Sequence, residues 1–181
     1  GLMETPVELV PLNCIRCGAP IPAEIEEVAW VCRQCEKGQQ LSDDGLIPLQ
    51  VNYSSRVAPD QKGRPFWVCE GQVTLNRRTY GSASKQNQDA LHFWEQPRTF
   101  IVPAFSYTLG EFSPVGIKWL QNPPAMDPVL IVDFEPITVA TEDVSDWAEF
   151  LVFALEAERS DKVKKIEFDL KLGEPKMWIL P

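Results

Sequence analysis

Four cysteines near the start of the chain lie in two closely spaced pairs. The sequence reads Cys14-x2-Cys17, then fourteen residues, then Cys32-x2-Cys35. Each Cys-x-x-Cys pair can place two thiolates on one tight turn, and two such turns complete a tetrahedral shell of four sulfur atoms. Zinc suits this shell because Zn²⁺ has no d-electron preference for another geometry. The spacing therefore predicts one zinc ion with four cysteine ligands.

The residues around the two pairs resemble the knuckles of a zinc ribbon. The knuckles read Cys-Ile-Arg-Cys-Gly over residues 14–18 and Cys-Arg-Gln-Cys-Glu-Lys-Gly over residues 32–38. Gly18 and Gly38 lie where the chain must fold back around a metal. The resemblance covers residues 12–48 and implies a small fold held together by the ion. Zinc ribbons serve in transcription, translation, enzyme lobes and protein contacts, so the resemblance predicts the metal more clearly than the function.

Other uses of the four cysteines remain open. Iron in a rubredoxin-like site competes, although such knuckles usually have a longer spacer and an internal proline, whereas Ile15, Arg16, Arg33 and Gln34 stand here. A redox Cys-x-x-Cys usually follows a strand and opens a helix, a pattern that is absent. Disulfides need an oxidising compartment, and residues 1–11 have neither a basic start nor a long apolar run. We therefore expect reduced thiols, a cytoplasmic location and a closed structural zinc site.

The distribution of charge argues against a nucleic-acid partner. The chain carries a formal net charge of −9, with −5 in residues 1–50, +2 in residues 51–127 and −6 in residues 128–181. Four thiolates around one divalent cation add about −2 to the ribbon. A nucleic-acid module normally presents a basic stripe that neutralises phosphates. The ribbon has the opposite sign, so we expect nucleic-acid binding to be the less favoured function.

Sequence pattern predicts an N-terminal tail of residues 1–11, a zinc ribbon of residues 12–48 and an α+β domain of residues 49–181, with the boundary near Pro48. Alternation predicts strands at residues 28–32, 39–41 and 46–53, with a turn between the last two in which Gly45 takes a positive φ. In the larger domain it predicts strands at residues 66–75 and 100–107, the second interrupted by Pro103 at an edge or bulge. No run is apolar and long enough to cross a membrane.

The rest of the larger domain is expected to be a mixture of loops, helices and strands. We predict a polar loop or hairpin tip at residues 80–90, a helix opening at Ser113-Pro114 and a strand at residues 128–138. The clearest helix should run from a Thr141 cap to Arg159, with an apolar stripe widened by Phe150 and Phe153. A C-terminal hairpin should turn at residues 173–175. The fold class is α+β, a mostly antiparallel sheet with one main helix.

No residue pattern predicts catalysis. His92 is the single histidine and stands beside aromatic residues, where packing or exposure is the commoner outcome. No nucleophile elbow and no phosphate-binding glycine loop occurs. Cys69 shares a strand face with Trp67 and Val73, which favours a buried, inert thiol.

One constellation in the basic central segment suggests an interaction surface. Arginines interleaved with aromatic residues are typical of protein-interface hot spots and of surfaces that stack single strands, although arginines rimming an aromatic core would look alike. The candidate surface residues are Arg64, Trp67, Arg77, Arg78, Trp94 and Arg98. We expect a non-catalytic zinc protein that binds an unknown protein partner or forms a homodimer. The alternatives are a nucleic-acid-binding or transcription-associated ribbon protein and an enzyme whose site the sequence does not reveal.

Overall fold

A sixteen-residue strand, β7 (Arg64–Thr79), organises the larger part of the molecule. The computed structural model describes residues 12–54, 60–79, 84–106, 109–126, 131–159 and 163–181. On one edge β7 pairs antiparallel with β8 (Arg98–Pro103), and on the other with β10 (Lys176–Leu180) and β9 (Val163–Leu172). The short strand β6 (Val51–Tyr53) adds to β10 in parallel. The α+β fold class is thereby confirmed.

The two C-terminal strands do not form the predicted hairpin. β9 and β10 lie end to end along β7, β9 opposite Gly71–Thr79 and β10 opposite Arg64–Val68. Gly173 continues this ladder, since its N–H donates to the carbonyl of Glu70 at 2.7 Å. The prediction was wrong because β7 is long enough to pair with both strands, so the chain has no reason to reverse at residues 173–175.

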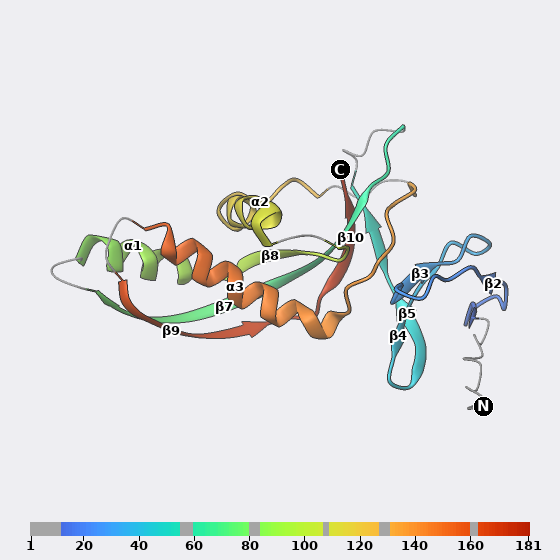
Figure 1. Ribbon diagram of the computed structural model, residues 1–181, viewed down its shortest axis with the longest axis horizontal. Coiled ribbons are helices and arrows are strands. Elements are labelled where there is room, and N and C mark those ends of the chain that lie inside the picture. The colour runs from blue at the N-terminus through green and yellow to red at the C-terminus, as the bar shows by residue number, and fades with distance from the viewer. Residues whose placement is uncertain (1–11, 55–59, 80–83, 107–108, 127–130, 160–162) are drawn as a thin grey trace, which may run out of the picture.

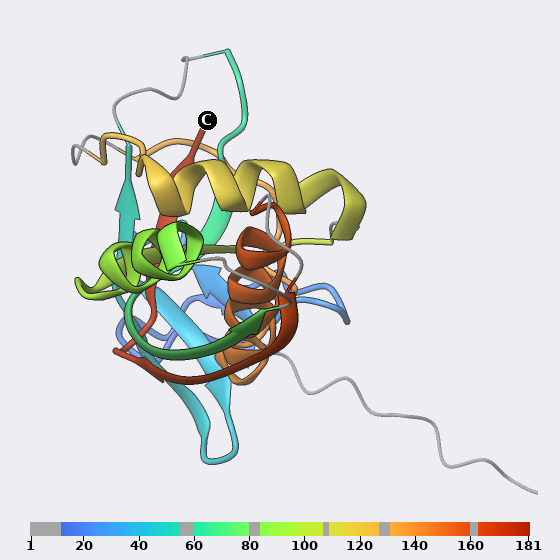
Figure 2. The ribbon, with the colours of Figure 1, turned by 90° about the vertical axis from the view of Figure 1, so that its left-hand side faces the viewer.

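Three helices lie on one side of the long strands, which curve around them (Figures 1 and 2). The first, α1 (Ser84–Trp94), covers most of the segment predicted to be a polar loop. That prediction was wrong because two apolar positions one turn apart, Ala90 and Trp94, are buried and anchor a helix whose first six residues are all polar. The part of the prediction at residues 80–83 lies outside the described residues.

The second helix, α2 (Leu109–Gln121), begins before the Ser113-Pro114 start that the sequence suggested. Phe112 is buried against the core and holds this earlier turn in place. Pro114 therefore sits inside the helix, at an exposed position.

The third helix matches its prediction more closely. A 3₁₀ turn, η1 (Thr141–Asp143), leads into α3 (Val144–Ala157), but no side chain caps either element, so the expected Thr141 cap is wrong. The predicted strand at 128–138 is also wrong over its described part. Residues 131–138 make only isolated bridges, at Phe134 and Ile137. Residues 128–130 lie outside the described residues.

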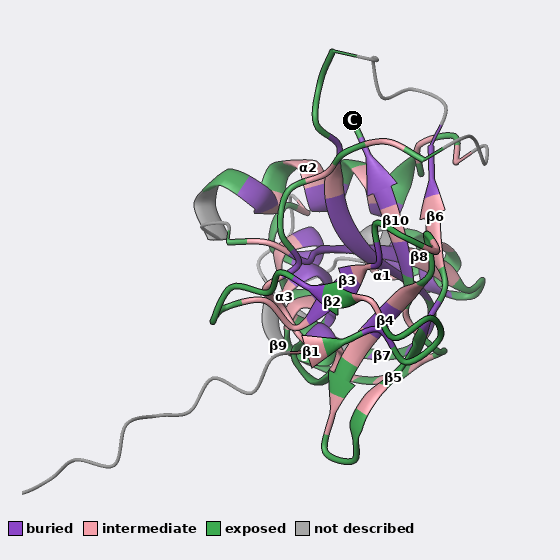
Figure 3. Ribbon diagram, turned by 90° about the vertical axis from the view of Figure 1, so that its right-hand side faces the viewer, coloured by how far each residue is buried: buried purple, intermediate pink, exposed green. Residues whose placement is uncertain are grey.

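Two small sheets form the N-terminal end of the molecule (Figure 3). The strands β1 (Leu12–Asn13) and β2 (Pro20–Ile21) flank the first cysteine pair. A second antiparallel sheet contains β3 (Ala29–Val31), β4 (Gly38–Ser42) and β5 (Gly45–Leu49), with Gly45 at a φ of 102° in the turn, as the sequence predicted. One face of this sheet adjoins the cysteines, while Ala29 and Leu49 on the other face join the core of the larger domain. The domain division near Pro48 stays a prediction.

Candidate metal centre and the residues around it

The four cysteines converge on one point. Their sulfur atoms all lie within 4.8 Å of one another, with 3.6 Å between Cys14 Sγ and Cys35 Sγ and 3.6 Å between Cys17 Sγ and Cys32 Sγ. Four thiolates placed about 2.3 Å from one ion form a tetrahedron with edges of about 3.8 Å. The sulfur atoms therefore fit one tetrahedral metal ion with little movement. Four protein ligands complete its shell and leave no place for a substrate.

The two knuckles repeat one backbone pattern. Gly18 N–H donates to the carbonyl of Cys14 at 2.9 Å, and Glu36 N–H donates to that of Cys32 at 2.8 Å. Both donors occupy the left-handed region, Gly18 at a φ of 78° and Glu36 at 63°. Glycine meets this requirement without strain, whereas a residue with a Cβ is disfavoured there. The sequence pointed to Gly38 for the second turn, but Glu36 carries the unusual conformation.

Hydrogen bonds to sulfur favour the thiolate form of Cys14. The side-chain amide of Gln39 donates to Cys14 Sγ at 3.4 Å, and the backbone N–H of Arg16 does so at the same distance. Gln39, which contributes most, and the backbone N–H groups of Cys17 and Arg16 lower the pKa of Cys14 to about 5. The thiolate is the form that binds a metal.

Sequence reasoning missed Gln39. Its side chain is 1% exposed, and its Oε1 accepts a hydrogen bond from the backbone N–H of Ile15 at 2.9 Å. The available signal was its position, one residue beyond Gly38 on a strand whose inward face borders the second knuckle. A glutamine in a strand is ordinarily expected to be exposed to solvent, so the sequence pattern alone does not predict that Gln39 is buried.

The residues of the predicted interaction surface do not share one exposed site. Trp67 is fully buried and its indole N–H donates to the carbonyl of Val139 at 2.7 Å, while Trp94 is 2% exposed. Both tryptophans belong to the core, so placing them at a surface was wrong. Residues 65–69 of β7 are buried in succession, so both faces of the strand are covered there.

The arginines of that set lie in separate places. Arg64 donates to the carbonyl of Pro181 at 2.9 Å, and its guanidinium lies 5.9 Å from the Phe66 ring centre. Arg98 stacks over Phe93 at 3.8 Å. Arg77 and Arg78 belong to β7, and their backbones pair with β9. Their side chains lie outside the described part of the structure.

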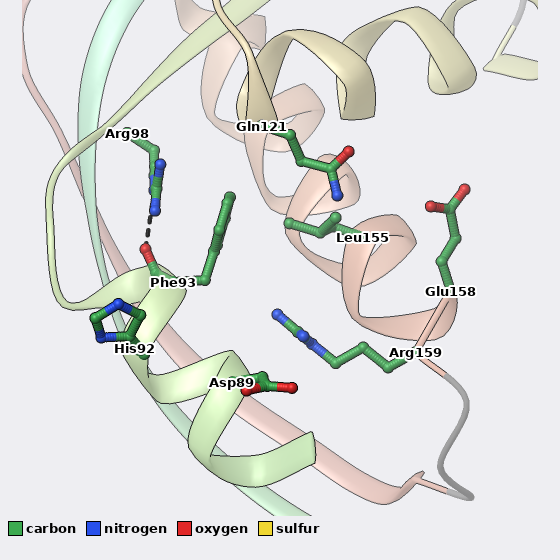
Figure 4. Close-up of a pocket in the computed structure, with 8 residues that line it drawn as sticks. All are labelled: Asp89, His92, Phe93, Arg98, Gln121, Leu155, Glu158 and Arg159. Atoms are coloured by element: carbon green, nitrogen blue, oxygen red, sulfur yellow. Dashed lines mark hydrogen bonds between the residues drawn. The ribbon is translucent and has the colours of Figure 1, made fainter. Parts of the chain in front are cut away.

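A pocket of about 620 Å³ lies where the C-terminal ends of α1 and α3 approach the last residue of α2 (Figure 4). Its lining includes two cations, Arg98 and Arg159, and two carboxylates, Asp89 and Glu158. Arg98 Nε donates to the Phe93 carbonyl at 2.8 Å. Charges of both signs therefore line the pocket, and no arrangement of nucleophile and base is present among its lining residues.

A buried carboxylate lies behind this pocket. Glu156 is fully buried, and its two oxygens accept hydrogen bonds of 2.7 Å from the indole N–H of Trp94 and from Nε of Arg159. The first hydrogen bond joins α1 to α3, and the second holds the Arg159 side chain in place. Charged groups in such a place need these partners, because an unpaired buried carboxylate is strongly disfavoured.

The two remaining candidate residues lie in contrasting surroundings. His92 is largely exposed, with its ring Nδ1 3.3 Å from a Glu95 carboxylate oxygen. Cys69 is buried at 3% exposure, and burial raises the pKa of its thiol to about 11. A thiol of that kind is a poor nucleophile at neutral pH.

Comparisons with known proteins identify no relative. No family model, no curated protein and no solved structure matches the chain. None of the helices in the described residues is long and apolar enough to span a membrane.

Proposed function

We propose that the protein is a non-catalytic zinc protein whose ribbon docks another protein. The closed shell of four cysteines supports a structural ion, because a catalytic metal needs an open coordination position. Zinc is favoured over iron by the short spacer and by the absence of proline from both knuckles. Thiolate ligands also require a reducing compartment, and the cytoplasm provides one.

One observation carries the docking proposal: apolar side chains are exposed on the side of the ribbon that borders the cysteines. Leu41 is 50% exposed and lies directly opposite Leu46 across β4 and β5. Pro48, also exposed, lies opposite Gln39 on the same face. Ile15, 49% exposed, joins them because its N–H bonds to the Gln39 side chain. We name this set, Ile15, Leu41, Leu46 and Pro48, the ribbon face.

Charge supports a protein partner over a nucleic acid. Residues 12–50 carry six acidic and three basic side chains, and the exposed Asp43 and Asp44 stand at the tip of the β4–β5 hairpin beside Leu41. Two acidic side chains at one end of an apolar strip fit a partner surface that combines apolar and basic residues. A polyanion would be repelled.

The test is site-specific photo-crosslinking in the native cell, with benzoylphenylalanine in place of Ile15 in the zinc-loaded chain. We expect a discrete protein adduct that disappears when Leu41→Asp is added. The matched control is Leu91→Asp, at an equally exposed leucine on α1, which should leave the adduct unchanged. Crosslinks to nucleic acid, or no adduct at all, would contradict the proposal.

Self-association is the simplest form of this proposal, with a second copy as the partner. The apolar stripe of α3, widened by Phe150 and Phe153, is a second place where another copy could bind. It is partly covered within the chain, since the Phe153 ring packs edge-on against Phe168 of β9 at 4.9 Å. Phe153 is nevertheless 48% exposed. Analytical ultracentrifugation of the zinc-loaded protein tells which surface a homodimer uses. If Phe153→Glu dissociates the dimer, the second copy binds at α3. If Leu41→Asp dissociates it, the second copy binds at the ribbon face.

A further inference from the structure

The first knuckle is hydrogen-bonded to the rest of the described chain through one buried side chain. Among the described residues, two hydrogen bonds link residues 12–21 to the remainder of the chain, apart from contacts between sulfur atoms. Both end on Gln39. Its Oε1 accepts from Ile15 N–H at 2.9 Å, and its Nε2 donates to Cys14 Sγ at 3.4 Å.

The second knuckle is held differently. The chain on either side of Cys32 and Cys35 forms β3 and β4, which pair directly with one another. The first knuckle has only the two-residue strands β1 and β2, which pair with each other and with no other strand in the described residues. Its position relative to the second knuckle therefore depends on the metal, on Gln39 and on the packing of Leu12, Ala19 and Ile21 against Trp30 of β3 and Leu46 of β5.

A fully buried amide side chain is tolerated only if its polar atoms form hydrogen bonds. Gln39 is 1% exposed, and burying an unpaired amide is costly, by about 1–3 kcal/mol in proteins. Besides Ile15 and Cys14, its Nε2 lies 3.5 Å from the carbonyl of Lys37 in the second knuckle. A single side chain thus contacts both halves of the metal site.

We propose that Gln39 is a positioning residue of the metal centre, which holds the first knuckle against β4 so that Cys14 and Cys17 face Cys32 and Cys35. Its acceptor oxygen fixes the backbone at Ile15. Its amide N–H stabilises negative charge on Cys14 Sγ. Residues that orient metal ligands in this way typically contribute a factor of ~10–100 to metal affinity.

Two substitutions separate the two contacts. Gln39→Met keeps the length of the side chain and removes both hydrogen bonds. Gln39→Glu keeps the acceptor for Ile15 N–H but places a carboxylate beside a thiolate. The matched control is Gln40→Met, the next residue of β4, whose side chain points to the opposite face of the sheet.

Competition with a chromophoric chelator measures zinc affinity in the full chain. We expect Gln39→Met to weaken zinc binding by ~10–100-fold and Gln39→Glu to weaken it at least as much. Gln40→Met should stay within about twofold of the parent protein. Equal affinity for all four proteins would overturn the proposal.

Two further readouts distinguish positioning from a general loss of stability. In the zinc-loaded Gln39→Met protein, the Ile15 amide should exchange with solvent at least about tenfold faster, because it loses its acceptor. With Co²⁺ in place of zinc, the d–d bands should shift or broaden in Gln39→Met but not in Gln40→Met. Unchanged Ile15 exchange and an unchanged cobalt spectrum would overturn the proposal. If Gln39→Met fails to fold, Gln39→Glu decides through zinc affinity and the cobalt spectrum.

Discussion

Ala29 of β3 and Ile137, which follows α2 by sixteen residues, pair as an isolated antiparallel bridge. Both residues are almost completely buried, and the neighbouring Val28 N–H donates to the Ile137 carbonyl at 2.9 Å. Leu49 at the end of β5 joins the same core. The sheet that supports the cysteines therefore contributes directly to the hydrophobic core of the α+β domain.

This shared core predicts how the protein responds when the metal is lost. Cys32→Ser removes a ligand, so the ribbon, too small to fold by itself, should unfold. The long β7 ladder and its helices keep their own core, so calorimetry should still show a cooperative transition. Its midpoint should be lower than in the zinc-loaded parent, because Ala29 no longer covers Ile137.

Two other calorimetric results would disagree with this account. An unchanged midpoint would mean that the bridge at Ala29 contributes nothing to the larger domain. Complete loss of the transition would mean that residues 49–181 have no independent core, and would refute the predicted two-domain division.

The two left-handed knuckle residues predict opposite effects of substitution. Gly18→Ala introduces a Cβ at a φ of 78° and should destabilise the zinc-loaded protein by about 1–2 kcal/mol, although no other atom lies within 4 Å of the added carbon. Glu36→Gly relieves the same strain at a φ of 63° and should stabilise it by up to about 1 kcal/mol. Urea unfolding of both variants checks the signs, and two changes of the same sign would contradict the argument.

The buried pair of Glu156 and Arg159 should be sensitive to removal of one member. Arg159→Ala takes the guanidinium from a fully buried carboxylate and should destabilise the protein by about 3 kcal/mol. Replacing Glu156 by glutamine and Arg159 by methionine should cost clearly less, since no charge is then left buried and the glutamine oxygen still accepts from the Trp94 indole N–H. Urea unfolding at pH 7 measures both. A double variant less stable than the single one would show that the pair stabilises the fold beyond charge compensation.

Thiol reactivity should sort the five cysteines into two groups. Cys14, Cys17, Cys32 and Cys35 should react with a small alkylating reagent soon after the metal is chelated, because their sulfur atoms are then no longer bound to it. Cys69 should stay unmodified at pH 8 until denaturant is added, since burial disfavours its thiolate and raises its pKa to about 11. Mass spectrometry counts the labels. Five labels without denaturant would show that the core around Cys69 opens.

That raised pKa also sets a pH dependence. The protonated thiol is the form favoured by the folded state, so its contribution to stability is complete below the ordinary cysteine pKa, near 9. It is lost as the pH rises from there through about 11. Cys69→Ala should therefore flatten the fall in stability over this alkaline range, as measured by urea unfolding at several pH values.

The sequence was informative where chemistry or strict alternation dictates the structure. The spacing of the four cysteines predicted their convergence, and the apolar positions of α3 and β9 predicted a helix and a strand. These patterns are local, because a knuckle or an amphipathic stripe is complete within a few turns of chain.

The errors arose where partners distant in sequence decide the structure. β10 follows β7 instead of folding back on β9, since β7 offers sixteen residues for pairing. A helix formed at residues 84–94 because Trp94 could reach Glu156, which lies 62 residues away. Gln39 became part of the candidate site because the first knuckle folds over it, and no local pattern marks such an acceptor.

Elemental analysis of the protein purified from its native cell without added metal tests the central claim most directly. Our account predicts one zinc per chain. The Cys14→Ser protein should contain no zinc and should bind no Co²⁺ in its place. Iron at one equivalent per chain, or a metal-free protein with a disulfide between Cys14 and Cys17, would contradict it.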